Sequence, residues 1–495
     1  MQVINLISAE KSNIQSQLKK LAEKLFRETN VAFDCHRIDV LVDSLNDDVF
    51  FLFEFPYIDE HFRDSYYLYY AEKFLEYKRN SIRVHIFNEK VDAKNFTEKR
   101  NSYLGYFIIR PLKQYILGHS FISPKAFKNN NFICCLEKSV VHILGNRFEV
   151  CAFPHVAQDT ETQTCAESSL WSLLSYFGAK YRNYRPYKPS EIIEKLSSIV
   201  GHRVLPSKGL LLGELAACLN SCGQNCTVYC LDKRDKENIK TNFSLMRIYI
   251  ESGMPFVVSL ENEKAGHAVL AIGHEEIESN KVLECRRESK KTWIDISEFD
   301  KKLVFIDDNC VPYSMDSCEA PALRYENFLH DMKIDMKISA FIVPFHKHMF
   351  IDAQIALGLI AKTFDDANFG LKEFGSRWIT RLLLTTGNSF KASVEKDSLM
   401  DEKFKSFFTM MSIPKFIWLC EIYSADSYLD DRCVGLVLID STGNKKSLAS
   451  VMFYCVNDFR MINDGISWIG KRNMQKFQKQ TYRNNLKGAW NGWTA

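Results

Sequence analysis

The stretch Gln158-Asp-Thr-Glu-Thr-Gln-Thr-Cys165-Ala-Glu-Ser-Ser-Leu-Trp-Ser-Leu-Leu-Ser-Tyr-Phe-Gly178 contains the pattern around which the rest of the chain is organised. From Ala166 onward its apolar residues recur at spacings of four and three, which predicts a helix. Gly178 follows the last apolar position and is typical of a helix end. Cys165 therefore lies at the predicted helix N-terminus, where free N–H groups and the helix dipole favour a negative charge. A thiol in such a position ionises more easily, and the thiolate is the nucleophilic form.

Two later stretches offer the base and the acid that a cysteine nucleophile needs. Residues 266–273 form an apolar run opened by His267, which predicts a buried strand. Residues 302–309 predict a second strand, which ends in Asp307 and Asp308. In this order an imidazole can accept the thiol proton, and a carboxylate can fix the tautomer and orientation of the imidazole. Because adjacent strand residues point to opposite faces, we expect only one of the two carboxylates to face the imidazole.

The polar run before the cysteine supplies a donor for a developing oxyanion. The side-chain amide of Gln158 and the backbone N–H of Cys165 can both serve in this role. His274 competes with His267 as the base, but it lies seven residues further on. That odd offset points the two imidazoles to opposite faces of one strand, so only one of them can face the cysteine. Gly266 favours His267, because a glycine lets the neighbouring backbone approach closely.

Four short motifs in this order resemble those of the papain-like cysteine peptidase superfamily, closest to the branch that includes the bacteriocin-leader-processing peptidases. They are Gln158, Cys165-Ala166, Gly266-His267 with its apolar run, and Asp308 after Leu303–Ile306. The resemblance covers roughly residues 150 to 345. It implies a helix-plus-sheet fold with the cleft between, a triad of Cys165, His267 and Asp308, and an oxyanion hole lined by Gln158.

The motifs depart from the family pattern at three positions. Ala166 stands where a glycine commonly follows the nucleophile. Gln158 lies seven residues before Cys165, one more than is usual, so either Gln158 or Gln163 can line the oxyanion hole. Asn309 replaces the proline that often follows the acid. These departures weaken the assignment of a substrate more than they weaken the assignment of the fold.

We expect three packed regions with an α/β (α+β) fold. A chain of 495 residues suggests about three domains, and 46% hydrophobic with 25% charged residues is typical of folded proteins. We expect an N-terminal α/β region over 1–145 and a papain-like cysteine peptidase domain over 146–345, in which a helix carries the cysteine and an antiparallel sheet carries the histidine and the acid. A C-terminal α/β region with a basic tail should occupy 346–495. No low-complexity linker separates the regions, so we expect them to pack on one another.

Local patterns predict further elements outside the central stretch. Residues 14–25 and 66–77 indicate helices, the second with an aromatic face, and residues 371–385 indicate another helix. Residues 31–42 and 81–87 indicate strands. The regions over 1–145 and 346–495 contain no recognisable chemical motif.

Neither the net charge nor the hydropathy of the chain indicates a nucleic-acid or membrane partner. The net charge of +3 requires neither a nucleic acid nor a membrane. Residues 471–487 hold six basic and no acidic side chains, which indicates a solvated tail or helix face; a contact with nucleic acid or an anionic surface is the less favoured alternative. No basic n-region precedes an apolar core at the N-terminus, and no run approaches the ~18 uncharged residues of a membrane span. We therefore expect a soluble, cytoplasmic protein.

The cysteine pattern favours buried thiols over a disulfide framework or a metal site. Fifteen cysteines are spread over the chain, which is typical of small buried hydrophobes in a reducing compartment. Cys218, Cys222, Cys226 and Cys230 recur every four residues, but Gly223 divides them between a predicted helix and a predicted strand. Their four sulfurs then cannot share one face, so we expect no metal ion and no cofactor.

The expected activity is that of a thiol hydrolase, specifically a cysteine protease with a protein or peptide substrate. The flanking regions would select the substrate or control access to the cleft, with a regulatory protein as a further partner. One alternative keeps the acyl-enzyme but changes the acceptor, as in an acyltransferase, transglutaminase or deamidase. The other alternative is a non-catalytic binding protein on the same scaffold.

Overall fold

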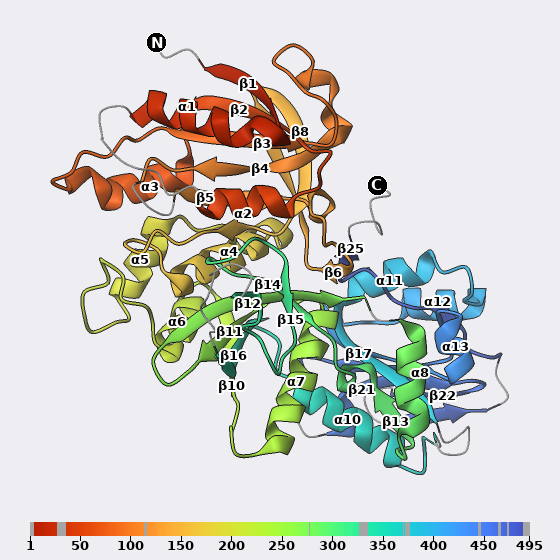
Figure 1. Ribbon diagram of the computed structural model, residues 1–495. Helices are drawn as coiled ribbons and strands as arrows, with labels where there is room; N and C mark the ends of the chain where they lie inside the picture. Colours follow the sequence, from red (N-terminus) through yellow and green to blue (C-terminus); the bar gives the residue numbers. More distant parts are fainter. Residues whose placement is uncertain are drawn as a thin grey trace.

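The computed structural model describes residues 4–26, 36–112, 116–276, 278–325, 335–369, 371, 377–443, 447–463, 467–472 and 475–488. These residues form an α/β fold in which helices pack between and around three mainly antiparallel sheets (Figure 1). The sheets follow one another along the chain, and the central one carries the candidate site.

The first sheet contains six antiparallel strands in the order β1-β2-β3-β4-β5-β9. Its strands have apolar residues on both faces. Phe51 and Phe53 of β2 belong to the same core as helices α1 and α2, whereas Leu52 packs against the hairpin of β7 and β8. This alternation follows from the two-residue period of a strand. The elements are β1 (Asn5–Glu10), α1 (Ile14–Phe26), α2 (His36–Ser44), β2 (Phe50–Tyr57), α3 (Glu60–Leu68), β3 (Ser81–Phe87), β4 (Tyr103–Ile109), β5 (Leu117–Ile122), β7 (Glu137–Ile143), β8 (Asn146–Ala152) and β9 (His155–Val156).

The central sheet has the order β10-β16-β11-β12-β14-β15, and β6 joins it by pairing with both β12 and β25. Leu270 and Ile272 of β12 face the core that contains α4 to α6, whereas Val269 and Ala271 face α7. Both faces of this sheet are therefore buried, which explains its nearly continuous apolar strands. The elements are β6 (Phe132–Cys134), α4 (Cys165–Lys180), α5 (Pro189–Ser197), α6 (Leu212–Ser221), β10 (Gln224–Cys230), α7 (Lys236–Glu251), β11 (Phe256–Glu261), β12 (Gly266–Glu275), β14 (Leu303–Ile306), β15 (Ser314–Asp316), β16 (Lys337–His346) and β25 (Lys487–Gly488).

The third sheet has the order β13-β17-β18-β20-β21-β22-β23, with one parallel pair, β13 with β17. One face shares a core with α7 and α10, and the other is covered by α8, α11 and α12. The elements are α8 (Ser279–Glu288), β13 (Trp293–Asp295), α10 (Ala353–Asp365), β17 (Trp378–Thr386), α11 (Gly387–Glu395), α12 (Glu402–Met410), β18 (Phe416–Tyr423), α13 (Ala425–Leu429), β19 (Arg432–Cys433), β20 (Gly435–Asp440), β21 (Val451–Val456), β22 (Phe459–Asn463), β23 (Trp468–Lys471) and β24 (Lys479–Gln480).

Strands cross the predicted region boundaries in both directions. β9 follows residue 145 but pairs with β5 of the first sheet, and β6 precedes residue 145 but belongs to the central sheet. β13 lies within 146–345 but pairs with β17 of the third sheet, while β25, near the C-terminal end, pairs with β6. The three regions are therefore interlocked by backbone hydrogen bonds as well as packed through side chains.

Three of the predicted elements were wrong in type or extent. Residues 36–42 of the predicted strand belong to helix α2, whose Ile38, Leu41 and Val42 are buried at helical spacing; residues 31–35 lie outside the described residues. The predicted helix over 371–385 contains strand β17, and its residues 372–376 lie outside the described part. β17 is apolar on both faces, and such a run has no period that separates strand from helix. The predicted helix over 66–77 corresponds to α3, which begins at Glu60, is capped by Asp59 and ends at Leu68.

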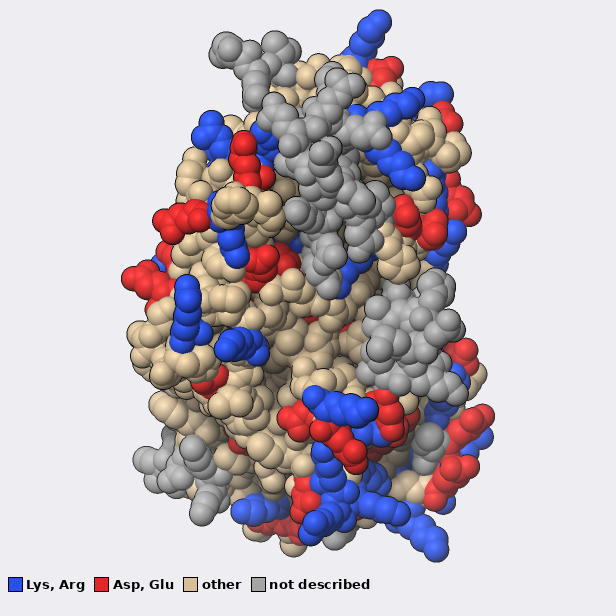
Figure 2. Space-filling model, turned by 60° about the vertical axis from the view of Figure 1, so that its left-hand side comes forward, with Lys and Arg blue, Asp and Glu red and all other residues tan. Residues whose placement is uncertain are grey.

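The structure also bears on the expectations for the cysteines, for membrane-spanning segments and for the basic segment. Every cysteine whose side chain the structure describes is a free thiol. Over the same residues, no helix combines the length and the apolar character that crossing a bilayer requires. The basic segment 471–487 is not simply a solvated tail, because the Lys479 ammonium is buried and donates to Glu421 at 3.1 Å. On the face in Figure 2, side chains of both charges lie around the margins, and the surface at the centre is largely uncharged.

Candidate active site

Cys165 is the first residue of helix α4, and hydrogen bonds to the Glu167 side chain fix this helix end. The Thr164 N–H and hydroxyl both donate to Glu167 Oε2, at 3.1 and 2.6 Å. The Ser207 hydroxyl donates to the other carboxylate oxygen, Oε1, at 2.6 Å. Glu167 is buried, whereas Cys165 is partly exposed. The cap therefore holds a reachable sulfur at a defined place in front of the free N–H groups of the helix.

The turn that leads into α4 is stabilised by hydrogen bonds from its backbone to the side chain of Asp159. Asp159 Oδ1 accepts the N–H groups of Thr162 and Gln163, both at 2.8 Å. Thr160 has a positive φ of 63°, which is rare for a β-branched residue and marks a tight turn. Arg110, buried in the first region, donates to the Gln158 carbonyl at 3.0 Å. The segment before the cysteine is thus fixed by hydrogen bonds within the turn and by a hydrogen bond from the first region.

His267 is the second residue of β12, and the strand pairing explains its position. β12 runs antiparallel to β14, with Leu270 opposite Ile306. The start of β12 therefore lies beside the residues that follow the end of β14. The His267 Nε2 atom lies 3.0 Å from Asp307 Oδ1, and the Cys165 side chain is close enough to the imidazole to contribute to its raised pKa. Because Nε2 faces the carboxylate, Nδ1 is the ring nitrogen left for the sulfur.

Asp307 is the centre of a buried hydrogen-bond network. Besides His267, its carboxylate accepts from Arg324 Nη2 at 2.8 Å, from the Tyr325 hydroxyl at 2.5 Å and from the Asn309 N–H at 2.9 Å. Burial alone would raise the pKa of Asp307. The positive charges of His267 and Arg324 and the donated hydrogen bonds hold its pKa well below the usual range instead. Asp307 is therefore an ionised carboxylate aimed at the imidazole.

The environment of His267 favours the imidazolium form. Burial alone would lower the pKa of this imidazole. The charge of Asp307, the hydrogen bonds to Asp307 and Cys165, and the charge of Asp308 raise its pKa well above the usual value. An imidazolium beside the sulfur stabilises a thiolate through charge attraction.

Asp308, favoured by the sequence as the partner of His267, has a different environment from Asp307. Its Oδ1 lies 3.7 Å from His267 Nε2, beyond hydrogen-bond distance, and neither carboxylate oxygen has a hydrogen-bond partner among the described residues. Burial and the neighbouring Asp307 raise the pKa of Asp308 to about 7. Both carboxylates lie near the imidazole because they follow the last residue of β14, where strand alternation no longer applies.

The two glutamines proposed for the oxyanion hole point in different directions. Gln158 is partly buried and donates through Nε2 to Asn309 Oδ1, next to the acidic pair. Arg37 of α2 donates to the same Asn309 oxygen and to the Asp308 carbonyl, both at 2.8 Å. Gln163 is buried, and its amide nitrogen lies 3.2 Å from His61 Nε2 in the first region. Of the two, Gln158 is the one that stays beside the acidic residues.

The remaining sequence expectations concern the rest of β12. His274 lies away from the cysteine, with its Nε2 atom 2.9 Å from Glu251 Oε1. The expected close backbone approach at Gly266 is not observed, since a Cβ atom there would meet no heavy atom within 4 Å. Gly266 instead borders open space beside His267.

Several residues of the site had no signal in the sequence. Arg37, Arg324 and Tyr325 hold the acidic segment, but none belongs to a recognisable motif. Two clusters of described residues bring potential metal ligands within 4.8 Å of one another. One consists of His267, Asp307 and Asp308, and the other of Asp59, His61 and His119.

Comparison of the sequence with protein-family models and with curated proteins finds no match.

Proposed function

We propose that the protein is a cytoplasmic, papain-like cysteine protease that cleaves a protein or peptide substrate through Cys165, His267 and Asp307. The observation that carries this proposal is an imidazole that neighbours a partly exposed thiol and is hydrogen-bonded to a buried ionised carboxylate. The imidazole and the carboxylate have the protonation states that their roles require, and each group has the neighbour that its role requires.

The chemistry follows from these positions. The Cys165 thiolate attacks the carbonyl carbon of the substrate, and a C–S bond forms as the carbonyl electrons move to oxygen. His267 then donates its proton to the leaving amine, and the C–N bond breaks. The neutral His267 next removes a proton from water, which attacks the thioester and releases the acid and the thiolate. Asp307 keeps the imidazole oriented through Nε2 and stabilises its positive charge.

The oxyanion would be stabilised at the N-terminus of α4. The Cys165 N–H belongs to the first turn, whose N–H groups have no partner within the helix. The Gln158 amide is the second donor in this proposal, and it would exchange Asn309 for the substrate oxygen. Donors placed where negative charge develops contribute several kcal/mol to the rate, on the order of 3 kcal/mol each.

The order of elements supports the same assignment. The cysteine begins a helix that packs on an antiparallel sheet, the histidine opens a strand of that sheet, and the acid follows the neighbouring strand. This is the arrangement that the resemblance to papain-like peptidases implies. We also propose that the first region controls access to the active site, because its Arg37 donates hydrogen bonds to the Asp308 carbonyl and to Asn309.

The test combines labelling with substrate cleavage. An iodoacetamide probe should label Cys165 faster than Cys230, which is the exposed control thiol. Cys165→Ser should abolish cleavage of an unfolded protein substrate with little change in Tm, whereas Cys230→Ser should cleave at the wild-type rate. Labelling of Cys165 should also slow in His267→Ala.

Mass spectrometry of the products separates the reaction classes. Substrate fragments support a protease, whereas intact substrate with an added group or a deamidated glutamine assigns the acyl-enzyme to transfer or deamidation. Undiminished cleavage by Cys165→Ser would overturn the nucleophile.

A further inference from the structure

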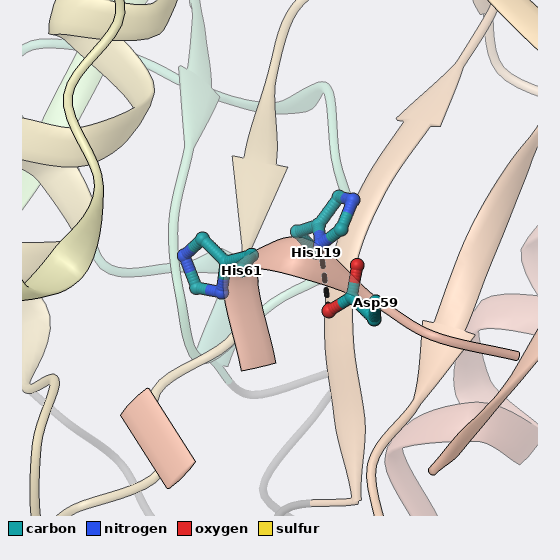
Figure 3. Close-up of side chains that lie close together, drawn as sticks. All are labelled: Asp59, His61 and His119. Atoms are coloured by element: carbon teal, nitrogen blue, oxygen red, sulfur yellow. Dashed lines mark ion pairs between the residues drawn. The ribbon is translucent and has the colours of Figure 1, made fainter. Parts of the chain in front are cut away.

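A second cluster of chemically active side chains lies between the first region and the catalytic helix. Asp59 caps α3, His61 lies in the first turn of α3, and His119 comes from β5. Figure 3 shows His119 facing Asp59, with His61 beside them. All three residues are more than nine-tenths buried, and one ligand atom from each lies within 4.8 Å of the others.

The distance between His119 and Asp59 does not fit a hydrogen bond. His119 Nδ1 lies 3.6 Å from Asp59 Oδ2, and this buried nitrogen has no hydrogen-bond partner among the described residues. Two ligand atoms bound to one tetrahedral zinc ion at about 2.1 Å lie about 3.4 Å apart. The separation is therefore close to the edge of a zinc coordination tetrahedron.

Both imidazoles are oriented by a partner on the far side of the ring. His119 Nε2 lies 3.3 Å from the Tyr106 hydroxyl, which leaves Nδ1 for the cluster. His61 Nε2 lies 3.2 Å from the Gln163 amide nitrogen, while Gln163 Oε1 is buried without a partner. Turning this amide over lets Oε1 accept the His61 Nε2–H and leaves the amide nitrogen in the position without a partner. The lone pair of His61 Nδ1 is then free, which is the orientation that metal-bound histidines have.

The ligand types of the cluster suit a cation. Asp59 offers a carboxylate oxygen, and His61 and His119 each offer a ring nitrogen.

We propose that Asp59, His61 and His119 bind one Zn²⁺ ion, which leaves a fourth coordination position for water and braces the first region against helix α4. Two imidazoles and one carboxylate are a ligand set that zinc accepts, whereas calcium and magnesium prefer oxygen. The rings of His61 and His119 pack on Trp171 of α4, with centroids 4.6 and 5.8 Å away. A metal ion here would also fix Gln163, two residues before Cys165. This site replaces the expectation of no metal.

Zinc content is the first test, and it needs no enzymatic activity. The full-length chain with His267→Ala is used, so that the catalytic cluster cannot hold the ion. After removal of metal with a chelator, dialysis against Zn²⁺ should restore one zinc per chain and raise Tm. His61→Gln, His119→Gln and Asp59→Asn should each lose this zinc and the rise in Tm. His85→Gln is the matched control, because His85 is a buried histidine paired with the carboxylate of Glu54 outside the cluster.

A ligand exchange keeps the test informative if a variant folds poorly. Co²⁺ bound in place of Zn²⁺ should give the visible spectrum of a tetrahedral site. In His119→Cys the ion should remain bound, and a thiolate-to-cobalt charge-transfer band should appear. Zinc uptake that is equal in the three cluster variants and the His85 control, or a cobalt spectrum unchanged by His119→Cys, would overturn the site. An ordinary Asp59–His119 ion pair would then account for the cluster.

Discussion

Two neighbouring aspartates with the same chemistry are in opposite states in this site. Asp307 is surrounded by Arg324, Tyr325 and His267, and its carboxylate is ionised. Asp308 is equally buried but has no hydrogen-bond donor among the described residues, so its pKa rises to about 7. The hydrogen bonds, and not the residue type, decide which carboxylate orients the base.

Asp307→Asn should lower kcat/KM more than Asp308→Asn, on the order of 10²-fold. Asp307 also raises the pKa of His267, and the imidazolium is the active form. Its loss should therefore move the alkaline limb of the pH profile towards neutral pH. Steady-state cleavage measured across the pH range, well below Tm, provides the check.

Asp316→Asn is the control for this comparison. Asp316 also pairs with the buried Arg324, at 3.0 Å, but it does not contact His267. It should lower Tm without moving the alkaline limb. A larger rate loss in Asp308→Asn than in Asp307→Asn would return the orienting role to Asp308.

The raised pKa of Asp308 predicts a pH-dependent cost in stability. Unfolded, this carboxyl titrates near 4, and folded it titrates at about 7. The folded state therefore binds the proton more tightly, and the contribution of Asp308 to the free energy of unfolding falls as pH rises from about 4 to about 7. The total loss is up to about 4 kcal/mol. Asp308→Asn should gain little stability over wild type at pH 4 and most at pH 7.5, as measured by urea unfolding. A gain independent of pH would contradict this.

At the scale of single elements, α4 positions the nucleophile through its N-terminus. Glu167 accepts both donors of Thr164 and the Ser207 hydroxyl, and it is buried. The backbone part of this cap also occurs on α6, where Glu214 accepts the Leu211 N–H at 2.8 Å at an exposed helix start. The two caps differ in burial and in their distance along the chain from Cys165.

Glu167→Ala should lower the free energy of unfolding by about 1 kcal/mol or more, because it removes the cap and leaves Ser207 and Thr164 without their acceptor. It should also slow substrate cleavage about tenfold or more, since a misplaced nucleophile loses its attack geometry. Glu214→Ala, the matched control, should affect Tm alone. Equal cleavage rates in the two variants would show that the cap does not position the sulfur.

At the scale of the whole molecule, the three regions exchange strands. β12, which carries His267, pairs with β6 from before residue 145, and β6 pairs with β25 near the C-terminal end. The core between the central sheet and α7 also includes Trp418 and Leu382 of the third region. Removing either flank would expose apolar surface and an unpaired strand edge, at the end of β12 away from His267.

An isolated 146–345 fragment should therefore be insoluble or lack fixed tertiary structure, as measured by soluble yield and near-ultraviolet circular dichroism. Coexpression of the 1–145 and 346–495 segments should restore part of the soluble yield. A soluble fragment that cleaves an unfolded protein at the same rate and at the same sites as the full chain would show that the flanking regions neither complete nor control the site.

The sequence by itself determined the elements that carry the chemistry. The apolar residues after Cys165 repeat with the period of a helix. The predicted strands at 266–273 and 302–309 overlap β12 and β14, the second of which ends at Ile306. These patterns are local, because the spacing of apolar residues a few positions apart sets the period of a helix or strand. The mixture of helices and strands followed from the same patterns, whereas the antiparallel sheet was expected from the resemblance.

Only the tertiary structure decided which side chains meet. Arg324 selects Asp307 over Asp308, and Asp59 lies beside His119 although 60 residues separate them in the chain. Strand β17, apolar on both faces, was mistaken for a helix because its partners and not its own period define it. Hydrogen bonds, burial and pKa values arise from contacts between distant segments, and the spacing of residues along the chain does not encode them.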